Sequence, residues 1–200
     1  MNHGESVKEL QTLLNQQGAK LDPDGWLGNE TKKAISSLNI PYYLKVALLE
    51  VGTKEIHGTL NNPRIIEYHK VSGGFSNDEV PWCGSFVNWV MLQSNYDTVK
   101  TPARAKSWLN FGIETDYPMP GAIAVKSRTG DKSRTGNGHV CFVLGYNQDG
   151  KLLCVGGNQN DEVNIKAYDK SVFLEFRVPE NLIKYKMLTF NMNSTSTREA

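Results

Sequence analysis

The sequence predicts an α+β fold, in which helices come first along the chain and antiparallel strands follow them. Before residue 120 most apolar residues recur at helical spacing, whereas after it they form short runs bounded by turn residues. The chain has 200 residues, which is enough for one mid-sized domain and a small accessory module. We therefore expect a helical module at residues 1–39, a main domain at residues 41–182 and a C-terminal tail at residues 183–200.

The composition is that of a soluble globular protein, with 39% hydrophobic and 22% charged residues. The net charge is +1, so nothing favours binding to nucleic acid, which needs a basic face. No apolar run is long enough to cross a bilayer, and the polar residues 1–10 lack the apolar segment of a signal peptide. We therefore expect a protein that is made in the cytoplasm and spans no membrane.

The N-terminal module consists of two predicted helices joined by a turn-rich segment at residues 22–28. It has few apolar residues, so we expect it to lean on the main domain. Its pattern resembles the peptidoglycan-binding module of many wall hydrolases, with matches at Val7, Leu10, Gln11, Leu14, Asp24, Gly25, Trp26, Leu27, Gly28, Thr31, Ala34 and Ile35. The resemblance implies binding to the cell wall. Trp26 either stacks on a sugar or fills the module's own small core.

In the main domain we expect helices at residues 43–51, around Ile65, and along the segment that carries Trp82, Phe86, Val87, Val90 and Met91. The expected strands are residues 122–125, 139–146, 151–155 and 172–178, with another around Ile165 and Tyr168. The loop at residues 126–138 repeats Ser-Arg-Thr-Gly and is rich in cations. It is either a lip that binds carboxylates of a peptide stem or a solvated glycine-rich loop.

Cys83 is the candidate nucleophile among three cysteines, an odd number that argues against a disulfide framework. Cys141 and Cys154 lie in apolar strand-like runs, where a cysteine is usually a small buried hydrophobe. Cys83 instead follows Pro81-Trp82 at the predicted start of a helix. The unpaired N–H groups of a first turn favour a thiolate there. Gly84 allows close approach of the backbone to a ligand.

A thiol nucleophile needs a base, and the chain has four histidines, His3, His57, His69 and His139. His3 lies in the N-terminal tail and His57 in a predicted loop. For His69, the simplest expectation is a side chain exposed to solvent. His139 opens an apolar strand, where an imidazole is costly unless it has partners. It is either a satisfied core histidine or the base, and we predict that it is the base.

A hairpin argument identifies the third member of the site. Residues 147–150, Asn-Gln-Asp-Gly, form a strong turn between two apolar runs. A symmetric turn places Tyr146 opposite Lys151, and His139 opposite Asn158. Directly opposed residues share a face of the sheet, with Cα atoms roughly 4.5–5.5 Å apart. We therefore predict that Asn158 orients the imidazole, unless a one-residue bulge places Gly157 or Gln159 there instead.

Three segments together resemble the CHAP and NlpC/P60 group of papain-like wall hydrolases: Pro81-Trp82-Cys83, Pro120-Gly121-Ala122-Ile123 and Gly138-His139-Val140. Further matches to one subfamily of this group run from Tyr42 to Pro179 and include Gly-Gly-Asn-Gln at residues 156–159. The resemblance implies a papain-like α+β fold with a Cys-His-polar site on Cys83, His139 and Asn158. It also implies hydrolysis of a peptidoglycan amide, either at the muramoyl–peptide link or within the peptide stem. Ala122 and Cys141 depart from the group's pattern, and Cys141 shares a face with His139.

Two other functions compete with this interpretation. A zinc-dependent amidase needs converging ligands, but no H-x-x-x-H or C-x-x-C motif occurs, so we expect neither a metal nor a cofactor. A non-catalytic wall-binding protein would keep the N-terminal module on an inactive hydrolase fold, which the complete Cys-His-Asn set argues against.

The expected partner is bacterial peptidoglycan. Without a leader, the protein would reach the wall as a phage endolysin after lysis, or as an effector delivered by a secretion system. An immunity protein and the delivery machinery would be its partners if it is an effector.

Overall fold

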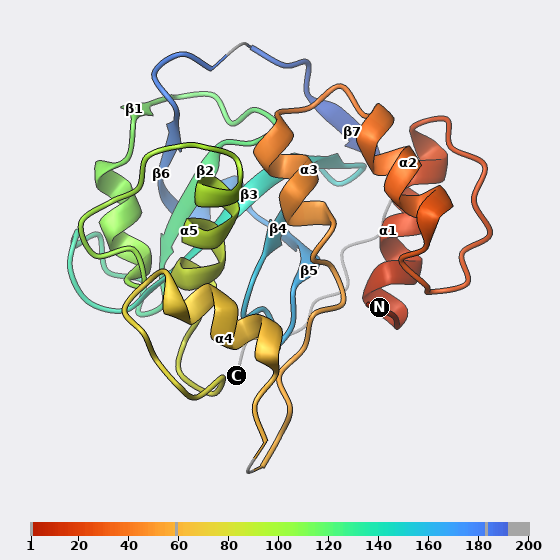
Figure 1. Ribbon diagram of the computed structural model, residues 1–200. Coiled ribbons are helices and arrows are strands. Elements are labelled where there is room, and N and C mark those ends of the chain that lie inside the picture. The colour runs from red at the N-terminus through yellow and green to blue at the C-terminus, as the bar shows by residue number, and fades with distance from the viewer. Residues whose placement is uncertain (1, 59, 183, 192–200) are drawn as a thin grey trace.

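The computed structural model describes residues 2–58, 60–182 and 184–191 and confirms the α+β fold class. Figure 1 shows the helical elements gathered around a central sheet. The helices are α1 (Glu5–Gln16), α2 (Asn29–Ser37), α3 (Tyr42–Leu48), α4 (Pro63–Lys70) and α5 (Cys83–Gln93), with the 3₁₀ helices η1 (Ala105–Asn110) and η2 (Lys170–Val172). None of these helices is long and apolar enough to span a membrane.

The strands form one twisted, mainly antiparallel sheet in the order β1-β6-β2-β3-β4-β5, and β7 pairs with β3 outside this path. Their bounds are β1 (Ile113–Glu114), β2 (Ile123–Ser127), β3 (Gly138–Asn147), β4 (Leu152–Gly156), β5 (Asn164–Tyr168), β6 (Phe173–Val178) and β7 (Leu188–Phe190). The predicted strands of the main domain are therefore present, while β1 and β7 were not predicted. Both are only two or three residues long, too short to show a period-2 pattern.

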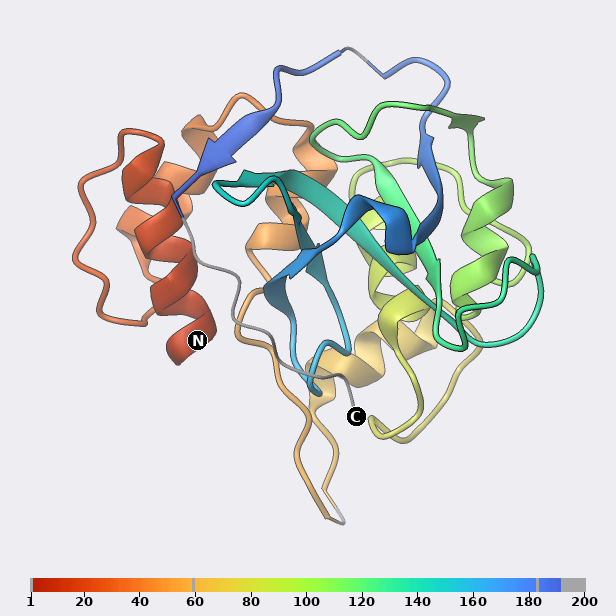
Figure 2. The ribbon, with the colours of Figure 1, turned by 180° about the vertical axis from the view of Figure 1, so that it is seen from behind.

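Helix α5 is the centre of the main core. All its residues from Cys83 to Met91 are buried, because α3, α4 and the sheet enclose it. Phe86 packs edge-on against Phe142 of β3, with ring centroids 6.4 Å apart. Figure 1 shows α3 and α5 in front of the sheet, and Figure 2 shows the strands from the opposite side. The sheet thus holds the start of α5 against β3.

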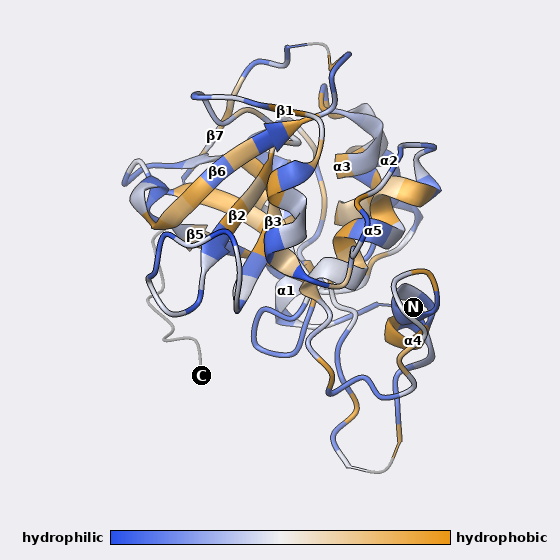
Figure 3. Cartoon of the chain, turned by 90° about the vertical axis from the view of Figure 1, so that its left-hand side faces the viewer, coloured by the Kyte–Doolittle hydropathy of each residue, from blue (hydrophilic) through white to orange (hydrophobic). Residues whose placement is uncertain are grey.

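The opposite face of the sheet carries a second, smaller apolar cluster. Alternation along the strands places Cys141 and Val143 on this face, together with aromatic residues of β5 and β6, namely Tyr168, Phe173 and Phe176. Figure 3 shows that β2, β3 and β6 are largely hydrophobic, whereas the loops beside them are hydrophilic. The strands are therefore buried on both faces, which explains their nearly continuous apolar sequences.

The N-terminal helices pack into the same core as the main domain. Val7, Leu10 and Leu14 are buried in one cluster with residues of α3, α5 and β3. The expectation that this module leans on its neighbour agrees with this packing. It follows that residues 1–39 have no separate hydrophobic core.

Several residues of the N-terminal motif support its turn. The buried amide of Gln11 donates to Asp24 Oδ1 at 2.8 Å and accepts from the N–H of Gly25 at 2.9 Å. Leu27 fills the core, whereas Trp26 is 51% exposed and stacks on His3 with ring centroids 4.7 Å apart. Of the two alternatives for Trp26, a core plug is therefore wrong.

The expectation of a loose tail after residue 182 is wrong for residues 188–190. They form β7, which runs parallel to β3 along Gly145, Tyr146 and Asn147. The side chain of Gln17, the residue directly after α1, donates to the carbonyl of Thr189 at 3.0 Å. β7 therefore joins the sheet to the N-terminal helices. Residues 184–187 and 191 of the expected tail form no helix or strand, and residues 183 and 192–200 lie outside the described residues.

Candidate active site

Cys83 is the first residue of α5, as the Pro81-Trp82 signal predicts. Trp82 is fully buried, and its indole N–H donates to Glu55 Oε1 at 2.6 Å, which anchors the turn before the helix. Gly84 is required for a different reason from the one predicted. A Cβ at Gly84 would lie 2.5 Å from the Pro102 carbonyl oxygen, so the close approach is made by the chain's own 102–103 segment.

The thiol of Cys83 experiences opposing electrostatic effects. Burial raises its pKa above the ordinary thiol value. The backbone N–H of Val140, the positive charge of Arg128 and the N–H groups of Gly84 and Cys83 act in the opposite direction. These donors are arranged to stabilise a thiolate, but burial outweighs them. Cys83 is therefore a neutral thiol near pH 7.

The imidazole of His139 is buried and oriented by Gln159. His139 Nε2 lies 3.1 Å from Gln159 Oε1, which also accepts from the hydroxyl of Tyr168 at 2.9 Å. The Gln159 amide nitrogen donates to the carbonyl and to Oδ1 of Asn164, each at 2.9 Å, and these bonds fix which end of the amide faces His139. Since Oε1 only accepts, neutral His139 carries its proton on Nε2. Nδ1 is then the atom that can take up a proton.

The predicted position of Asn158 opposite His139 is therefore corrected to Gln159. β3 and β4 contain an irregularity between Val143 and Gly145, so Tyr146 pairs with Leu152 and not with Lys151. The register nearer the site matches the predicted one, but β4 ends at Gly156. Asn158 then adopts a left-handed backbone conformation with φ 56°. This turn directs Gln159 back over Gly156 towards the imidazole, whereas the Asn158 side chain makes no hydrogen bond within the described residues.

The glycines of this segment explain why the chain can bend here. A Cβ at Gly157 would lie 2.5 Å from the Trp82 ring, and one at Gly156 would lie 2.8 Å from Cys141 Cβ. Gly157 thus lies against the start of α5, and Gly156 lies against Cys141 on the opposite face of the sheet. The orienting residue therefore lies within the predicted Gly-Gly-Asn-Gln segment. The left-handed turn at Asn158 decides that it is Gln159 and not Asn158.

The structure brings the residue after His139 to Cys83, whereas the imidazole lies with Gln159 and Cys141 and does not line the pocket at Cys83. The N–H directed at the Cys83 thiol belongs to Val140, the residue after His139. No hydrogen bond joins the two side chains in the part of the chain that the structure describes. The imidazole also interacts with Cys141, whose pKa burial and Cys154 raise well above the ordinary value, while His139 opposes that rise. The predicted crowding of His139 by Cys141 agrees with this contact.

A pocket of about 300 Å³ opens at Cys83. Its walls come from three segments: the turn before α5, the chain before η1, and both ends of the 126–138 loop. The lining residues are Pro81, Cys83, Ala103, Arg104, Ala105, Arg128, Gly136, Asn137 and Gly138. Cys83, although buried, thus borders a pocket whose walls carry two guanidinium groups.

The loop at residues 126–138 is folded around the buried ammonium group of Lys106. Lys106 Nζ donates to Asp131 Oδ1 at 3.0 Å and to the carbonyls of Ser133 and Thr135 at 2.8 Å. Hydrogen bonds from Thr129 and Lys106 hold the pKa of Asp131 well below its ordinary value. The exposure of residues 128–137 agrees with the alternative of a solvated loop, and Lys106 anchors that loop from beneath. Lys106 was not recognised from the sequence, because nothing in an exposed-looking Lys-Ser-Trp segment signals a buried amine.

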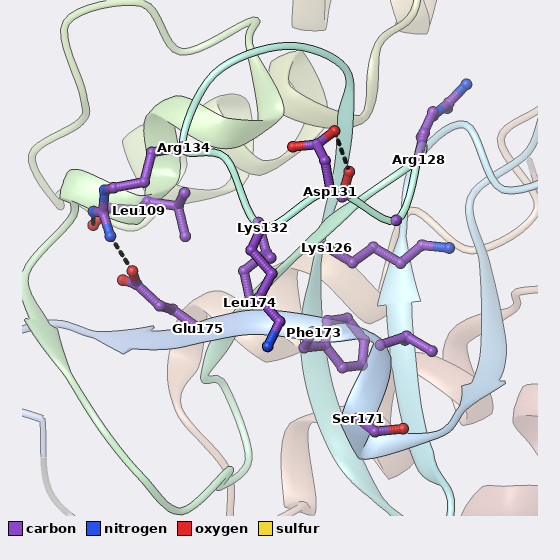
Figure 4. Close-up of a pocket in the computed structure, with 13 residues that line it drawn as sticks. Leu109, Lys126, Arg128, Asp131, Lys132, Arg134, Ser171, Phe173, Leu174 and Glu175 are labelled. Atoms are coloured by element: carbon purple, nitrogen blue, oxygen red, sulfur yellow. Dashed lines mark hydrogen bonds and ion pairs between the residues drawn. The ribbon is translucent and has the colours of Figure 1, made fainter.

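A second pocket, of about 650 Å³, lies on the other side of this loop (Figure 4). Its floor includes Phe173 and Leu174 of β6. Figure 4 shows Arg134 paired with Glu175, while the Arg128 side chain extends away from Phe173. Arg128 borders both pockets. The loop thus separates a large pocket over β6 from the smaller one at Cys83.

The other candidate residues lie elsewhere. Cys141 and Cys154 are buried with no disulfide, as expected. His69 is fully buried and its Nδ1 lies 3.1 Å from Ser85 Oγ, so the expectation that it is exposed is wrong. Among residues 2–58, 60–182 and 184–191, no cluster of three or more His, Cys, Asp or Glu side chains could hold a metal ion.

Comparison with known families gives one match. Residues 75–158 match the family model of the CHAP domain, a segment that contains both Cys83 and His139 and ends just before Gln159. No curated protein and no solved structure matches the chain.

Proposed function

We propose that this chain is a cysteine-dependent peptidoglycan hydrolase of the amidase or peptidase type, with Cys83 as nucleophile and His139 as base, and the match of residues 75–158 to the CHAP domain supports this proposal. The observation that carries the proposal is the 3.1 Å contact between His139 Nε2 and Gln159 Oε1, from which the tautomer of His139 follows. Gln159 holds the proton on Nε2, so Nδ1 is the basic atom of a ring whose backbone neighbour contacts the Cys83 thiol. Gln159 is a positioning residue in this proposal.

The proposed reaction is acyl transfer through a thioester. His139 Nδ1 takes the thiol proton as Cys83 Sγ bonds to the amide carbonyl carbon. The imidazolium then gives that proton to the leaving amine as the C–N bond breaks. A water molecule, deprotonated by Nδ1, attacks the thioester and releases the acid, and the proton returns to Sγ.

The thiol and imidazole must close their contact for this reaction. Catalytic hydrogen bonds often tighten only in the complex with substrate. The raised pKa of Cys83 fits a thiol that is deprotonated by its base during attack rather than before it. The N–H groups of Cys83 and Gly84 would stabilise the negative charge that develops at the helix start.

We also propose that the N-terminal helices bind the wall. The exposed ring of Trp26, stacked on His3, offers an aromatic surface of the kind that packs against sugars. Action on the wall would follow release through phage lysis or delivery by a secretion system, and in the second case an immunity protein would be a partner.

The decisive experiment is digestion of purified sacculi by the wild type and by Cys83→Ala. We expect Cys83→Ala to release no soluble fragments while still binding sacculi and keeping its melting temperature. Cys154→Ala, which removes a buried thiol on the other face of the sheet, is the matched control and should retain activity at a temperature where it is folded. A tenth or more of the wild-type activity in Cys83→Ala would refute the nucleophile.

Two further measurements complete this test. Mass spectrometry of the fragments identifies whether the muramoyl–peptide amide or a stem peptide bond is cut. Activity should persist in millimolar EDTA, whereas loss under EDTA with rescue by zinc would favour a metal-dependent amidase instead.

A further inference from the structure

Two arginines stand apart from the others in the described structure. Arg64 pairs with Glu50 and Glu67, Arg134 with Glu175, and Arg177 with Glu114 and Glu175. In contrast, Arg104 and Arg128 have neither an ion pair nor a side-chain hydrogen bond within the described residues. Both line the pocket at Cys83. Among the described residues, the arginines without a carboxylate partner thus lie beside the candidate nucleophile.

Among the residues that the structure describes, no acidic side chain lines this pocket to neutralise them. The nearest acid of the loop, Asp131, is occupied by Lys106 and Thr129 on the side of the larger pocket. Figure 4 shows Arg128 directed away from Lys126 and Phe173 and therefore away from the floor of that larger pocket. Its charge acts on the Cys83 thiol. The positive charge of Arg128 therefore acts at the Cys83 pocket.

The position of the two arginines is fixed by structure that the chain builds around them. Arg104 follows the 102–103 segment, which packs against Gly84 at the start of α5. Arg128 begins the loop that Lys106 holds, and its N–H donates to the Asn137 carbonyl at 3.3 Å. Both backbones are therefore held at the pocket, although both side chains are exposed.

We propose that Arg104 and Arg128 bind a carboxylate of the substrate, so that the preferred substrate carries a free carboxylate next to the amide that Cys83 attacks. A guanidinium group matches a carboxylate with two parallel hydrogen bonds, which gives both affinity and orientation. Two of them at the mouth of a pocket of about 300 Å³ select an acidic acyl compound over its neutral amide. The identity of the substrate rests on the proposed function, whereas the carboxylate site itself does not.

The carboxylate site is tested without any turnover by alkylation of Cys83. Iodoacetate carries a carboxylate and iodoacetamide is its neutral counterpart, and peptide mapping by mass spectrometry reports the modification of Cys83 alone. The ratio of the two rates cancels changes in thiolate fraction, because both reagents attack the same thiolate. We expect the iodoacetate to iodoacetamide ratio to fall about tenfold in Arg104→Gln and in Arg128→Gln, the loss expected for a charge-assisted hydrogen bond.

Lys132→Gln is the matched control. It removes one positive charge from the same loop, but Lys132 lines the larger pocket and not the one at Cys83. We expect its ratio to stay within about twofold of the wild type, the size of a screened surface effect. An equal fall in Lys132→Gln, or no fall in either arginine variant, would overturn the proposal.

Turnover of substrate provides the second test of the proposal. Two soluble muropeptides that differ only in a carboxylate or a carboxamide beside the cleaved bond are compared. Wild type should prefer the carboxylate form, and the double variant Arg104→Gln/Arg128→Gln should lose that preference. The preference is read as the ratio of the two kcat/KM values, so that any effect of Arg128 on the Cys83 thiol, which acts on both compounds, cancels. If the wild type cleaves neither compound, the proposed function fails while the alkylation result still decides the carboxylate site.

Discussion

Gln159 Oε1 lies 3.1 Å from His139 Nε2 and fixes both the tautomer and the plane of the imidazole. Gln159 is itself held by Tyr168 and Asn164, so the orienting group has all its polar atoms engaged. The amide is neutral and adds no charge of its own, whereas Lys126, the register partner of His139 on β2, is a cation on the same face of the sheet.

Gln159→Ala should therefore lower kcat by roughly tenfold to a thousandfold with little change in KM, since it removes orientation and not substrate contacts. The measurement is steady-state turnover of a soluble muropeptide, with sacculus binding as a check on folding. Asn158→Ala is the matched control and should change kcat by less than about threefold, while the loss of a left-handed Asn should lower stability slightly. Equal losses in the two variants would assign the orienting role elsewhere.

The rate of Cys83 alkylation by neutral iodoacetamide should rise with pH through the alkaline range. Burial places the pKa of the thiol above its ordinary value, so the reactive thiolate is a minor species at pH 7 and grows as the pH increases. Mapping of modified Cys83 between pH 5 and pH 10 gives the titration. A plateau reached below pH 7 would instead show a thiolate–imidazolium pair and would contradict a neutral resting thiol.

Trp26→Ala should weaken binding to sacculi about three- to tenfold, the loss expected for one aromatic stacking contact. The experiment is a pelleting assay in the Cys83→Ala background, where hydrolysis cannot release the protein. Tyr117→Ala removes another exposed aromatic ring, 77% exposed, outside the N-terminal helices and serves as control. The same loss in Tyr117→Ala would show nonspecific adsorption rather than a binding site on α1 and α2.

The pH dependence of stability should include a contribution from Glu9 on α1. Burial, and then repulsion from Glu162, raise the pKa of Glu9 from 4.5 to about 7. The folded state therefore binds this proton more tightly than the unfolded state. The free energy of unfolding should fall as the pH rises from about 4.5 to about 7, and the protonated form is the stabilising one.

Glu9→Gln should remove this dependence and raise the free energy of unfolding at pH 8 by about 1 kcal/mol, a value reduced for solvent screening. Urea unfolding at pH 5 and pH 8 provides the measurement. Glu5→Gln removes an exposed carboxylate from the same helix and should not reproduce the gain. An unchanged pH dependence in Glu9→Gln would show that other groups cause it.

The sequence predicted the residues whose environment is set locally. Cys83 follows a helix-start signal, and its place at the first residue of α5 depends only on neighbouring residues. His139 opens a long apolar strand, which alternation alone identifies. Gln159 could not be separated from Asn158, because the choice depends on where β4 ends and on the left-handed turn at Asn158.

Long-range features were the least predictable. The amine of Lys106 holds the 126–138 loop by donating to oxygens of residues about 25 to 29 positions later in the chain. No local sequence pattern indicates such a contact. The two arginines at Cys83 come from segments that only the packing of the 102–103 segment on Gly84 brings together.

The late strand β7 has a consequence for how the protein is made. It covers the backbone of β3 at Gly145, where any side chain would collide with the carbonyl oxygen of Leu188. Until residues 188–190 leave the ribosome, that stretch of β3 has exposed backbone groups that another chain can pair with. A chain shortened before Leu188 should therefore keep the residues of the active site yet aggregate during expression, so the solubility of C-terminal truncations depends on three residues far from the chemistry.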